Sequence, residues 1–454
     1  MISEHPAVQA YARHVNPAFV KLLGVFGYGR LFERAEDVWI YDHEGRRYLD
    51  LLAGFGAVNL GHNHPRLRER LAAFLGEQPL NLVHVGPSRH EAALAEALAA
   101  WAPEPLQVAL FSSSGAEAVE AGLKLARAAT GRAGFVSCAG GFHGTNLGTL
   151  SVMGARRMRA PFEPLLAACA QVPFGDLDAL AAALRRKPAA FLLEPIQGEA
   201  GVILPPPGYL ADAQRLCAKA GTLLVLDEVQ TGIGRTGARF ALEHEPGFVP
   251  DVLCLAKALG GSLIPIGATL TRAELQRKAY GSMDRFDLHS STFGGNSLAC
   301  AAALETLRIV DEEGLVDAAR ERGAQLVDGL RRRLAGHPFV REVRGRGLLV
   351  GVELGPTDAS LLGRLAPGLV RLVSQQMFGQ WAALCLLERG VICQPASQQW
   401  DVLKLEPPLT IGAEQVTEAI EAVAGVLEAY EGVAGILADV SRRVGSQLLK
   451  GWSF

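Results

Sequence analysis

The sequence predicts an α/β fold, with a large domain built on a mostly parallel sheet and a smaller α+β domain. Its 454 residues exceed what one compact core usually holds. Between Ser88 and Val310, helical patterns alternate with short apolar strands, which is typical of a parallel sheet covered by helices. The pattern changes on both sides of that range, so we expect the two end segments to build the smaller domain together.

The N-terminal region carries two β-like segments, Val38–Asp42 and Arg47–Leu51, separated by the turn signal Asp-His-Glu-Gly. A small sheet is expected to begin there. In the central region, helices are predicted at Glu91–Ala100 and Ala116–Ala129. The strands predicted between and after them are Gln107–Phe111, Ala133–Ser137, Ala189–Leu193, Leu223–Leu226 and Val252–Leu255.

From about Gly314 the pattern becomes a helix, a strand at Gly347–Leu354 and further helices, with Pro407-Pro408 as a break. We therefore expect residues 1–75 to form the N-terminal segment of the small domain. Residues 76–315 would form the large domain, and residues 316–454 the C-terminal small domain.

Two apolar features stand out in the C-terminal part. One is an insertion over residues 355–395, which includes the apolar run Met377–Leu387. The other is an amphipathic tail with an apolar stripe made by Val433, Ile436, Leu437, Val440, Val444 and Leu448. Both fit helices docked on their own domain or on a partner subunit. They also fit an apolar entrance for a long-chain or lipid-derived aldehyde, which leaves a lipophilic or membrane-associated substrate open.

Composition and charge exclude several classes of partner. A formal net charge of −3 and a pI near 6.4, without a basic stripe, give no reason to expect nucleic acid. Neither a secretory signal nor a membrane span is expected, because the N-terminus lacks an apolar core and charges interrupt the apolar stretches. The seven cysteines form no CxxC pair, so we expect reduced core residues in a cytoplasmic protein, and no metal site is predicted.

A lysine and a carboxylate follow two of the predicted strands. Asp227 ends the strand at Leu223–Leu226, and Lys257 comes directly after the buried strand Val252–Leu255. Pyridoxal phosphate needs a lysine amine that reacts with its aldehyde and a carboxylate that keeps its pyridine nitrogen protonated. A lone lysine at such a junction is usually a surface residue. Here the apolar surroundings would desolvate Lys257, lower its pKa and favour the reactive amine.

Polar or small residues follow the other strands too, where ligands bind in open parallel sheets. Ser112–Ala118 enters a helix whose N-terminus suits a phosphate. Phe142 follows the next strand and suits a flat ring, while Glu194 and Glu199 follow another strand. The segment Ser290–Asn296 offers hydroxyls beside glycines, as a second possible anion site.

These motifs resemble those of class III aminotransferases, in the fold type I superfamily of pyridoxal phosphate enzymes, and are most similar to the putrescine and ornithine aminotransferase branch. The resemblance runs from Asp42 to about Ile420 and implies a seven-stranded, mostly parallel sheet in the large domain. It also implies pyridoxal 5'-phosphate as cofactor and a homodimer with shared active sites. The motifs are SGAEAVEAGLKLAR (114–127), FHG (142–144), EPIQGEAGVILPPPGYL (194–210), LVLDEVQTGIGRTG (224–237), LCLAKALGG (253–261), STFGGN (291–296) and LEPPLT (405–410).

The resemblance also assigns roles to residues. It implies that Lys257 is the Schiff-base lysine and proton shuttle, and that Asp227 is the partner of the pyridinium. Phe142 would stack on the cofactor ring, and Gln230 would reach its phenolic oxygen. The remaining cofactor contacts that it implies come from Ser114, Gly115, Ala116, His143, Val229 and, from the neighbouring subunit, Thr292.

Two departures from the family pattern concern the substrate. Ornithine-type relatives carry, at position 404, an arginine that pairs with the glutamate matching Glu199 or binds a substrate α-carboxylate; here it is Lys404. Lysine lacks the planar fork for a two-bonded carboxylate contact. Thr145 stands where those relatives often place a cation for the second carboxylate of 2-oxoglutarate. We expect Lys404 to pair with Glu199, so that removal of Glu199 would leave Lys404 unpaired.

Three functional hypotheses follow. The first is a transaminase that moves an amino group between a terminal primary amine, or an ω-amino acid, and an aldehyde or 2-oxo acid, in a ping-pong reaction through pyridoxamine phosphate. Its alternative form acts on a lipid or natural-product aldehyde, for example of the hopanoid type. The second is an aminomutase or decarboxylase on the same fold, which no motif favours. The third, a binding protein on a dead scaffold, conflicts with the intact Lys257 and Asp227.

Overall fold

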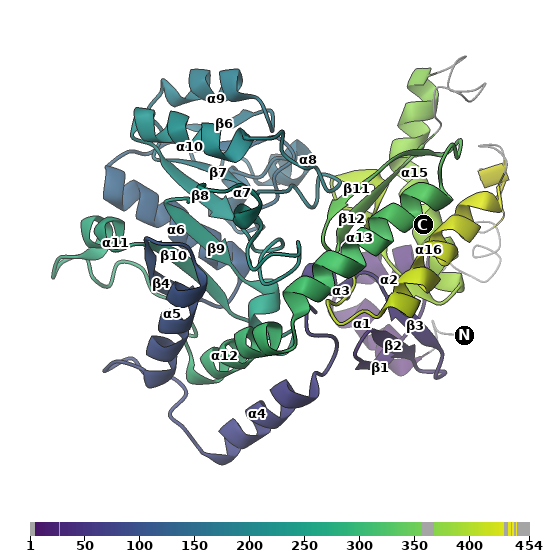
Figure 1. Cartoon of the computed structure of the whole chain (residues 1–454), viewed down its shortest axis with the longest axis horizontal. Coiled ribbons are helices and arrows are strands. Elements are labelled where there is room, and N and C mark those ends of the chain that lie inside the picture. The colour runs from purple at the N-terminus through teal and green to yellow at the C-terminus, as the bar shows by residue number, and fades with distance from the viewer. Residues whose placement is uncertain are drawn as a thin grey trace.

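The computed structural model describes residues 5–26, 28–355, 367–430, 435–436, 438–439 and 442. It has a large α/β part and a smaller part beside it (Figure 1). In the smaller part, strands from the N-terminal region lie next to helices and strands from the C-terminal region, as Figure 1 shows by colour.

The large part is built on a seven-stranded sheet in the order β4-β10-β9-β8-β7-β5-β6. Neighbouring strands from β9 to β6 run parallel, whereas β10 runs antiparallel to both β4 and β9. The predicted large, mostly parallel sheet is therefore confirmed. Its strands are β4 (Leu106–Ser112), β5 (Phe135–Cys138), β6 (Cys169–Val172), β7 (Ala190–Leu193), β8 (Leu223–Asp227), β9 (Val252–Leu255) and β10 (Gly267–Arg272).

Helices cover this sheet and connect its strands. Helix α6 illustrates why they form where they do. Ser114 caps its N-terminus by accepting a hydrogen bond from the Glu117 N–H, and Gly131, at a φ of 68°, ends it in the left-handed conformation. The longer helices of this part are α4 (Pro65–Gly76), α5 (Arg89–Trp101), α6 (Gly115–Thr130), α9 (Leu177–Leu184), α10 (Tyr209–Ala220), α11 (Ala273–Tyr280) and α12 (Ser297–Glu312); α3 (Ala53–Gly56), α7 (Leu147–Ser151) and α8 (Arg156–Arg159) are short.

The smaller part contains two four-stranded sheets. In the first, β13 from the C-terminal region pairs in parallel with β3 from the N-terminal region, so that Val391 lies opposite Leu49. The segments before and after the large sheet thus share one sheet, as the sequence suggested. The first sheet holds β1 (Phe32–Glu36), β2 (Trp39–Asp42), β3 (Arg47–Asp50) and β13 (Val391–Ile392); the second holds β11 (Val340–Arg346), β12 (Leu349–Leu354), β15 (Gln399–Leu405) and β14 (Gln394–Ala396).

The helices that complete the described chain are α1 (Pro6–His14), α2 (Pro17–Phe26), α13 (Leu315–Arg333), α15 (Pro367–Glu388) and α16 (Ala413–Glu428). Helix α15 carries the predicted apolar insertion and packs against β15. Its described side chains, such as Phe378, Trp381 and Leu386, are buried. That burial favours the docked-helix interpretation over an apolar entrance.

The tail is described at only a few positions. Ile436 is buried, whereas Val433, Leu437, Val440, Val444 and Leu448 lie outside the described residues. Over the described part of the chain, we find no helix with the length and apolar character needed to cross a membrane.

Candidate active site

The residues that follow the parallel strands meet at one cavity of about 180 Å³. Strand β8 delivers Asp227, the turn after β9 delivers Lys257, and the loop after β5 delivers Phe142 and His143. They converge because parallel strands end at the same edge of a sheet. The full lining is Gly115, Ala116, Phe142, His143, Gly144, Glu194, Glu199, Asp227, Val229, Gln230 and Lys257.

Lys257 begins a short 3₁₀ turn, Lys257–Gly260, in a left-handed backbone conformation with a φ of 46°. A non-glycine residue in that conformation is strained, and such strain gathers at functional sites. The surrounding protein desolvates the amine and lowers its pKa, and the nearby Lys404 ammonium lowers it further. Both effects favour the neutral amine, which is the nucleophilic form.

Asp227 is held by two donors. Its Oδ1 accepts a hydrogen bond from the Val229 N–H at 3.0 Å, and its Oδ2 lies 2.8 Å from His143 Nδ1. Burial would lower the pKa of His143, but the hydrogen bond and the charge of Asp227 outweigh it, so the pKa is raised. Asp227 and His143 thus form a buried hydrogen-bonded pair. The other ring nitrogen, Nε2, is buried without a partner among the described residues.

Glu194 shapes the loop that carries Phe142. Its two oxygens accept hydrogen bonds from the N–H groups of Phe142, at 2.8 Å, and Gly198, at 3.2 Å. Burial raises the pKa of this carboxyl to about 7. Glu194 therefore ties together the loops that follow β5 and β7, which places Phe142 on the cavity wall.

The start of α6 forms another wall. Gly115 and Ala116 line the cavity, whereas Ser114 does not and instead caps the helix. A Cβ on Gly115 would lie 2.7 Å from a methyl carbon of Val229, so only glycine allows this close approach. The unpaired N–H groups and dipole at a helix start favour an anion such as a phosphate.

Lys404 lies behind the cavity wall in a fully buried cluster of charges. Its Nζ forms an ion pair with Glu199, as expected, and a second one with Glu406 at 2.9 Å. Burial alone would raise the pKa of Glu199, but the charges of Lys404 and Lys257 lower it to about 2. Glu199 also accepts a hydrogen bond from the Ser397 N–H at 2.9 Å.

The ion pair between Lys404 and Glu406 corrects the expectation that Glu199 is the single ion-pair partner of Lys404. Without Glu199, the second ion pair would still hold the lysine. A signal for Glu406 was present in the sequence, because Lys404 and Glu406 are two positions apart at the end of a strand and so face the same side. In the sequence, Pro407 indicates only a break in the secondary-structure pattern, so Glu406 receives no role there.

Thr292 does not join this cavity. It is exposed, in the segment between α11 and α12. The same segment exposes four large apolar side chains, with exposed fractions of 89% for Met283, 65% for Phe286, 58% for Leu288 and 56% for Phe293. Within the described part of the chain, no element covers these four side chains. Thr145, the other position singled out from the sequence, is also exposed.

Known proteins resemble this chain over most of its length. The family model described as Aminotransferase class-III matches residues 27–427. The chain belongs to the class III aminotransferases. Aminotransferase PigE of Serratia sp. (strain ATCC 39006) is 38% identical over 468 residues, an alignment that covers 94% of this chain and 54% of PigE. The chain thus spans about half the length of that curated relative.

Solved structures of aminotransferases share the fold. The ornithine aminotransferase from Toxoplasma gondii has a TM-score of 0.78 at 31% identity, covering 88% of this chain and 91% of that one. A PLP-bound amine transaminase from an uncultivated Pseudomonas species has a TM-score of 0.78 at 30% identity, covering 88% and 95%. The fold type I prediction is therefore confirmed, and membership of this family implies a transaminase that uses pyridoxal phosphate.

The cavity of this class III aminotransferase fits that cofactor. A desolvated lysine amine, the Asp227 carboxyl group hydrogen-bonded to His143, an aromatic wall at Phe142 and the start of α6 surround one space. These are an amine for the aldehyde, a carboxylate for the pyridine nitrogen, a face for the ring and an anion site for the phosphate.

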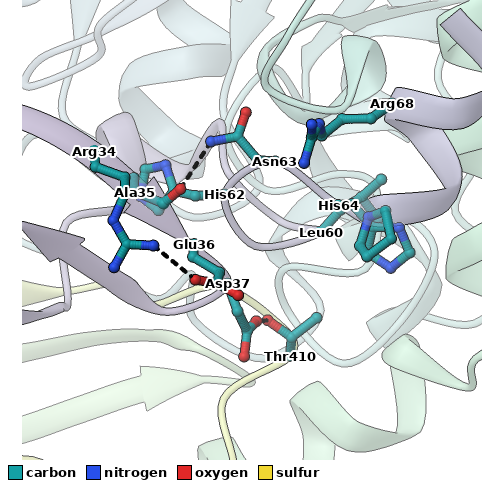
Figure 2. Close-up of a pocket in the computed structure, with 11 residues that line it drawn as sticks. Arg34, Ala35, Glu36, Asp37, Leu60, His62, Asn63, His64, Arg68 and Thr410 are labelled. Carbon is teal, nitrogen blue, oxygen red and sulfur yellow. Dashed lines mark hydrogen bonds and ion pairs between the residues drawn. The ribbon is translucent and has the colours of Figure 1, made fainter. Parts of the chain in front are cut away.

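A larger pocket of about 750 Å³ lies elsewhere in the molecule, around the β1–β2 turn and the start of α4 (Figure 2). Several of its polar groups pair within the wall: Arg34 contacts Glu36 at 3.0 Å, and Thr410 donates a hydrogen bond to Asp37 at 2.6 Å. None of the site residues expected from the sequence lines it. Despite its smaller size, the cavity around Lys257 is the one that brings together the residues expected from the sequence.

Proposed function

We propose that this enzyme takes an amino group from a terminal primary amine, such as a diamine, an alkyl or lipid-derived amine or an ω-amino acid, and passes it to an aldehyde or 2-oxo acid. The observation that carries this proposal is the buried pairing of Lys404 with carboxylates. A bound α-carboxylate needs a cation, and an arginine is the usual partner. Within the described part of the chain, the cavity lining includes no arginine.

Each residue of the cavity would have a separate role in this reaction. When bound, pyridoxal phosphate supplies an electron sink that stabilises negative charge on the substrate carbon. Asp227, hydrogen-bonded to His143, would hold the proton on the pyridine nitrogen. Phe142 would face the ring, Gln230 would reach its phenolic oxygen, and Lys257 Nζ would take up a proton from the substrate carbon and later give it back.

The phosphate would bind at the start of α6. Gly115 and Ala116 would contribute backbone N–H groups, Ser114 would hold the first turn in place, and Val229 would pack under the site. Thr292 would complete the phosphate contacts from a second copy of the chain. This arrangement makes the enzyme a homodimer with shared active sites, and its apolar segment around Phe286 would be covered by the partner.

Steady-state kinetics with single amines test the proposal. Butylamine, putrescine, dodecylamine, alanine and glutamate are each paired with pyruvate, 2-oxoglutarate or butanal, leaving out the acceptor that is the donor's own oxo product, and kcat/KM is compared. The proposal expects the terminal amines to exceed both α-amino acids. A preference for dodecylamine over butylamine would select the lipid-aldehyde form of the reaction. A strong preference for glutamate would refute the assignment of the donor class.

A further inference from the structure

We propose that Glu406 determines the substrate class by holding Lys404 away from substrate carboxylates. It acts as a positioning residue through Lys404 and does not itself contact the substrate. This inference rests on the proposed function, because it concerns why the site would reject an α-carboxylate. The evidence lies in the geometry of the buried cluster formed by Lys404, Glu199 and Glu406.

Backbone contacts fix Glu406. It follows β15 directly, and its N–H donates a hydrogen bond to the Leu51 carbonyl at 2.9 Å. The next residue, Pro407, accepts a hydrogen bond from the fully buried guanidinium of Arg235, which also donates to the Leu348 carbonyl at 2.9 Å. Glu406 is therefore attached to a rigid segment that joins the two parts of the molecule.

The side chain of Glu406 has little room to move. A Cβ added to Gly56, whose φ is 77°, would lie 3.1 Å from Glu406 Oε2. The backbone at Gly56 therefore lies close to the carboxyl group of Glu406 on one side. The Lys404 ammonium lies 2.9 Å from Oε1 and 5.5 Å from the centre of the Phe55 ring. Lys404 thus sits between two carboxylates and an aromatic face, and both Lys404 and Glu406 are fully buried.

The two carboxylates differ in what they would lose if Lys404 moved. Glu199 keeps a hydrogen bond from the Ser397 N–H, at 2.9 Å, and lies near the Gln230 amide. Among the described residues, Glu406 accepts no hydrogen bond from any other group, so Lys404 is its close cationic partner. Moving Lys404 would leave the buried Glu406 without its ion-pair partner, with only the less direct charges of Lys257 and Arg235 nearby, which costs more than breaking an exposed pair.

Charge balance points the same way. Lys404 forms ion pairs with both carboxylates, while the charges of Lys257 and Arg235 act on Glu406 without a direct ion pair, so the Lys404 ammonium already has two close anionic partners. Burial raises the pKa of Glu406, while the charge of Lys404 opposes that rise. The pKa of Lys404 is itself raised, since the two carboxylates outweigh its desolvation. Lys404 therefore stays protonated and paired with Glu199 and Glu406.

The experiment uses the cofactor-loaded enzyme and butyrate, a carboxylate that has no amine. Calorimetry measures butyrate binding to wild type, Glu406→Asp and Glu406→Gln. We expect affinity to rise in that order, by about tenfold or more for Glu406→Gln, since the cluster then loses one negative charge and Lys404 keeps only Glu199 as a partner. The KM for glutamate should fall with it, while kcat for glutamate changes less.

Two further variants separate this role from a structural one. In a Lys404→Met background, Glu406→Gln should no longer change butyrate affinity, because the effect passes through Lys404. Glu305→Gln is the control: it weakens the ion pair between the buried Glu305 and the partly exposed Arg66, 3.0 Å apart and outside the cavity, and should leave butyrate affinity unchanged.

Unchanged butyrate binding in Glu406→Gln, or an effect that persists without Lys404, would overturn the inference. If Glu406→Gln does not fold, Glu406→Asp decides the question in the same direction. Butyrate binding is measured by calorimetry and does not depend on turnover, so it tests the role of Glu406 separately from the donor class. A wild-type enzyme that prefers glutamate would refute the donor class, whereas equal butyrate binding in all variants would refute the role of Glu406.

Discussion

Lys257 combines three properties: a desolvated amine, a left-handed backbone and a position at the end of a buried strand. We expect Lys257→Ala to fold and to lose transamination, because no other side chain of the cavity lining is placed to return the proton. Turnover with butylamine, together with the melting temperature, checks this. The control Lys278→Ala changes an exposed lysine paired with Glu274 and should keep activity. Wild-type turnover in Lys257→Ala would contradict the proposed role of Lys257.

Asp227→Asn should lower kcat by orders of magnitude while the protein still binds its cofactor. The substitution removes the charge that holds a proton on the pyridine nitrogen, an effect of about 3 kcal/mol or more in a site that excludes water. It also removes the partner that raises the pKa of His143, so that histidine becomes neutral at lower pH. Pre-steady-state kinetics and cofactor absorbance measure both results. Unchanged kinetics would mean that another group serves the nitrogen.

Glu199 links the buried cluster to stability. Its pKa falls from 4.5 to about 2 in the folded protein, so its ionised form stabilises the fold at higher pH, and this contribution disappears as pH falls from about 4.5 towards 2. The shift corresponds to about 3 kcal/mol. The difference in urea midpoint between wild type and Glu199→Gln should therefore be largest near pH 7 and shrink towards pH 3. A difference that does not depend on pH would contradict this.

At the scale of single elements, helix α6 offers the sharpest test. A Cβ at Gly115 would press on Val229 and move the first turn, so Gly115→Ala should weaken cofactor binding by about tenfold. Gly131→Ala is the matched control at the other end of the same helix. It costs about 1 kcal/mol through its left-handed backbone, yet has open space around it and should keep cofactor affinity. Spectroscopic titration with pyridoxal phosphate measures both.

The elements that sequence patterns predicted are those with clear apolar periodicity. Strands β7 and β9 are buried along their whole length, and both were predicted. Strand β11 was missed because its sequence, VREVRGR, alternates charges with small residues. Strand β6 was missed because three of its four residues are partly exposed at the sheet edge, so its sequence lacks a continuous apolar run.

The candidate site followed the same rule. Residues that come directly after predicted strands, such as Asp227 and Lys257, could be placed together from the sequence alone, because parallel strands end at one edge of a sheet. Glu406 could not, because β15 carries a buried charge on each face, Asp401 and Lys404, and so does not look like a core strand. Only tertiary packing shows their partners, which are Arg341 for Asp401 and the two glutamates for Lys404.

For the whole molecule, the proposed dimer makes a further prediction. Sedimentation should give a mass of twice 48.2 kDa. Phe286→Asp, in the exposed apolar segment, should shift the protein towards monomers and reduce activity, because Thr292 would no longer reach the second site. The control Phe162→Asp changes another exposed phenylalanine, outside that segment, and should leave the mass unchanged. A stable, active monomer would exclude shared sites.

The donor class is the central claim, and one half-reaction tests it without any acceptor. The cofactor-loaded enzyme is mixed with putrescine, butylamine or glutamate, and the conversion of the pyridoxal to the pyridoxamine form is followed by its visible absorbance. We predict fast, complete conversion with at least one of the two terminal amines and slow or no conversion with glutamate. Rapid conversion by glutamate, with neither terminal amine reacting, would contradict the account.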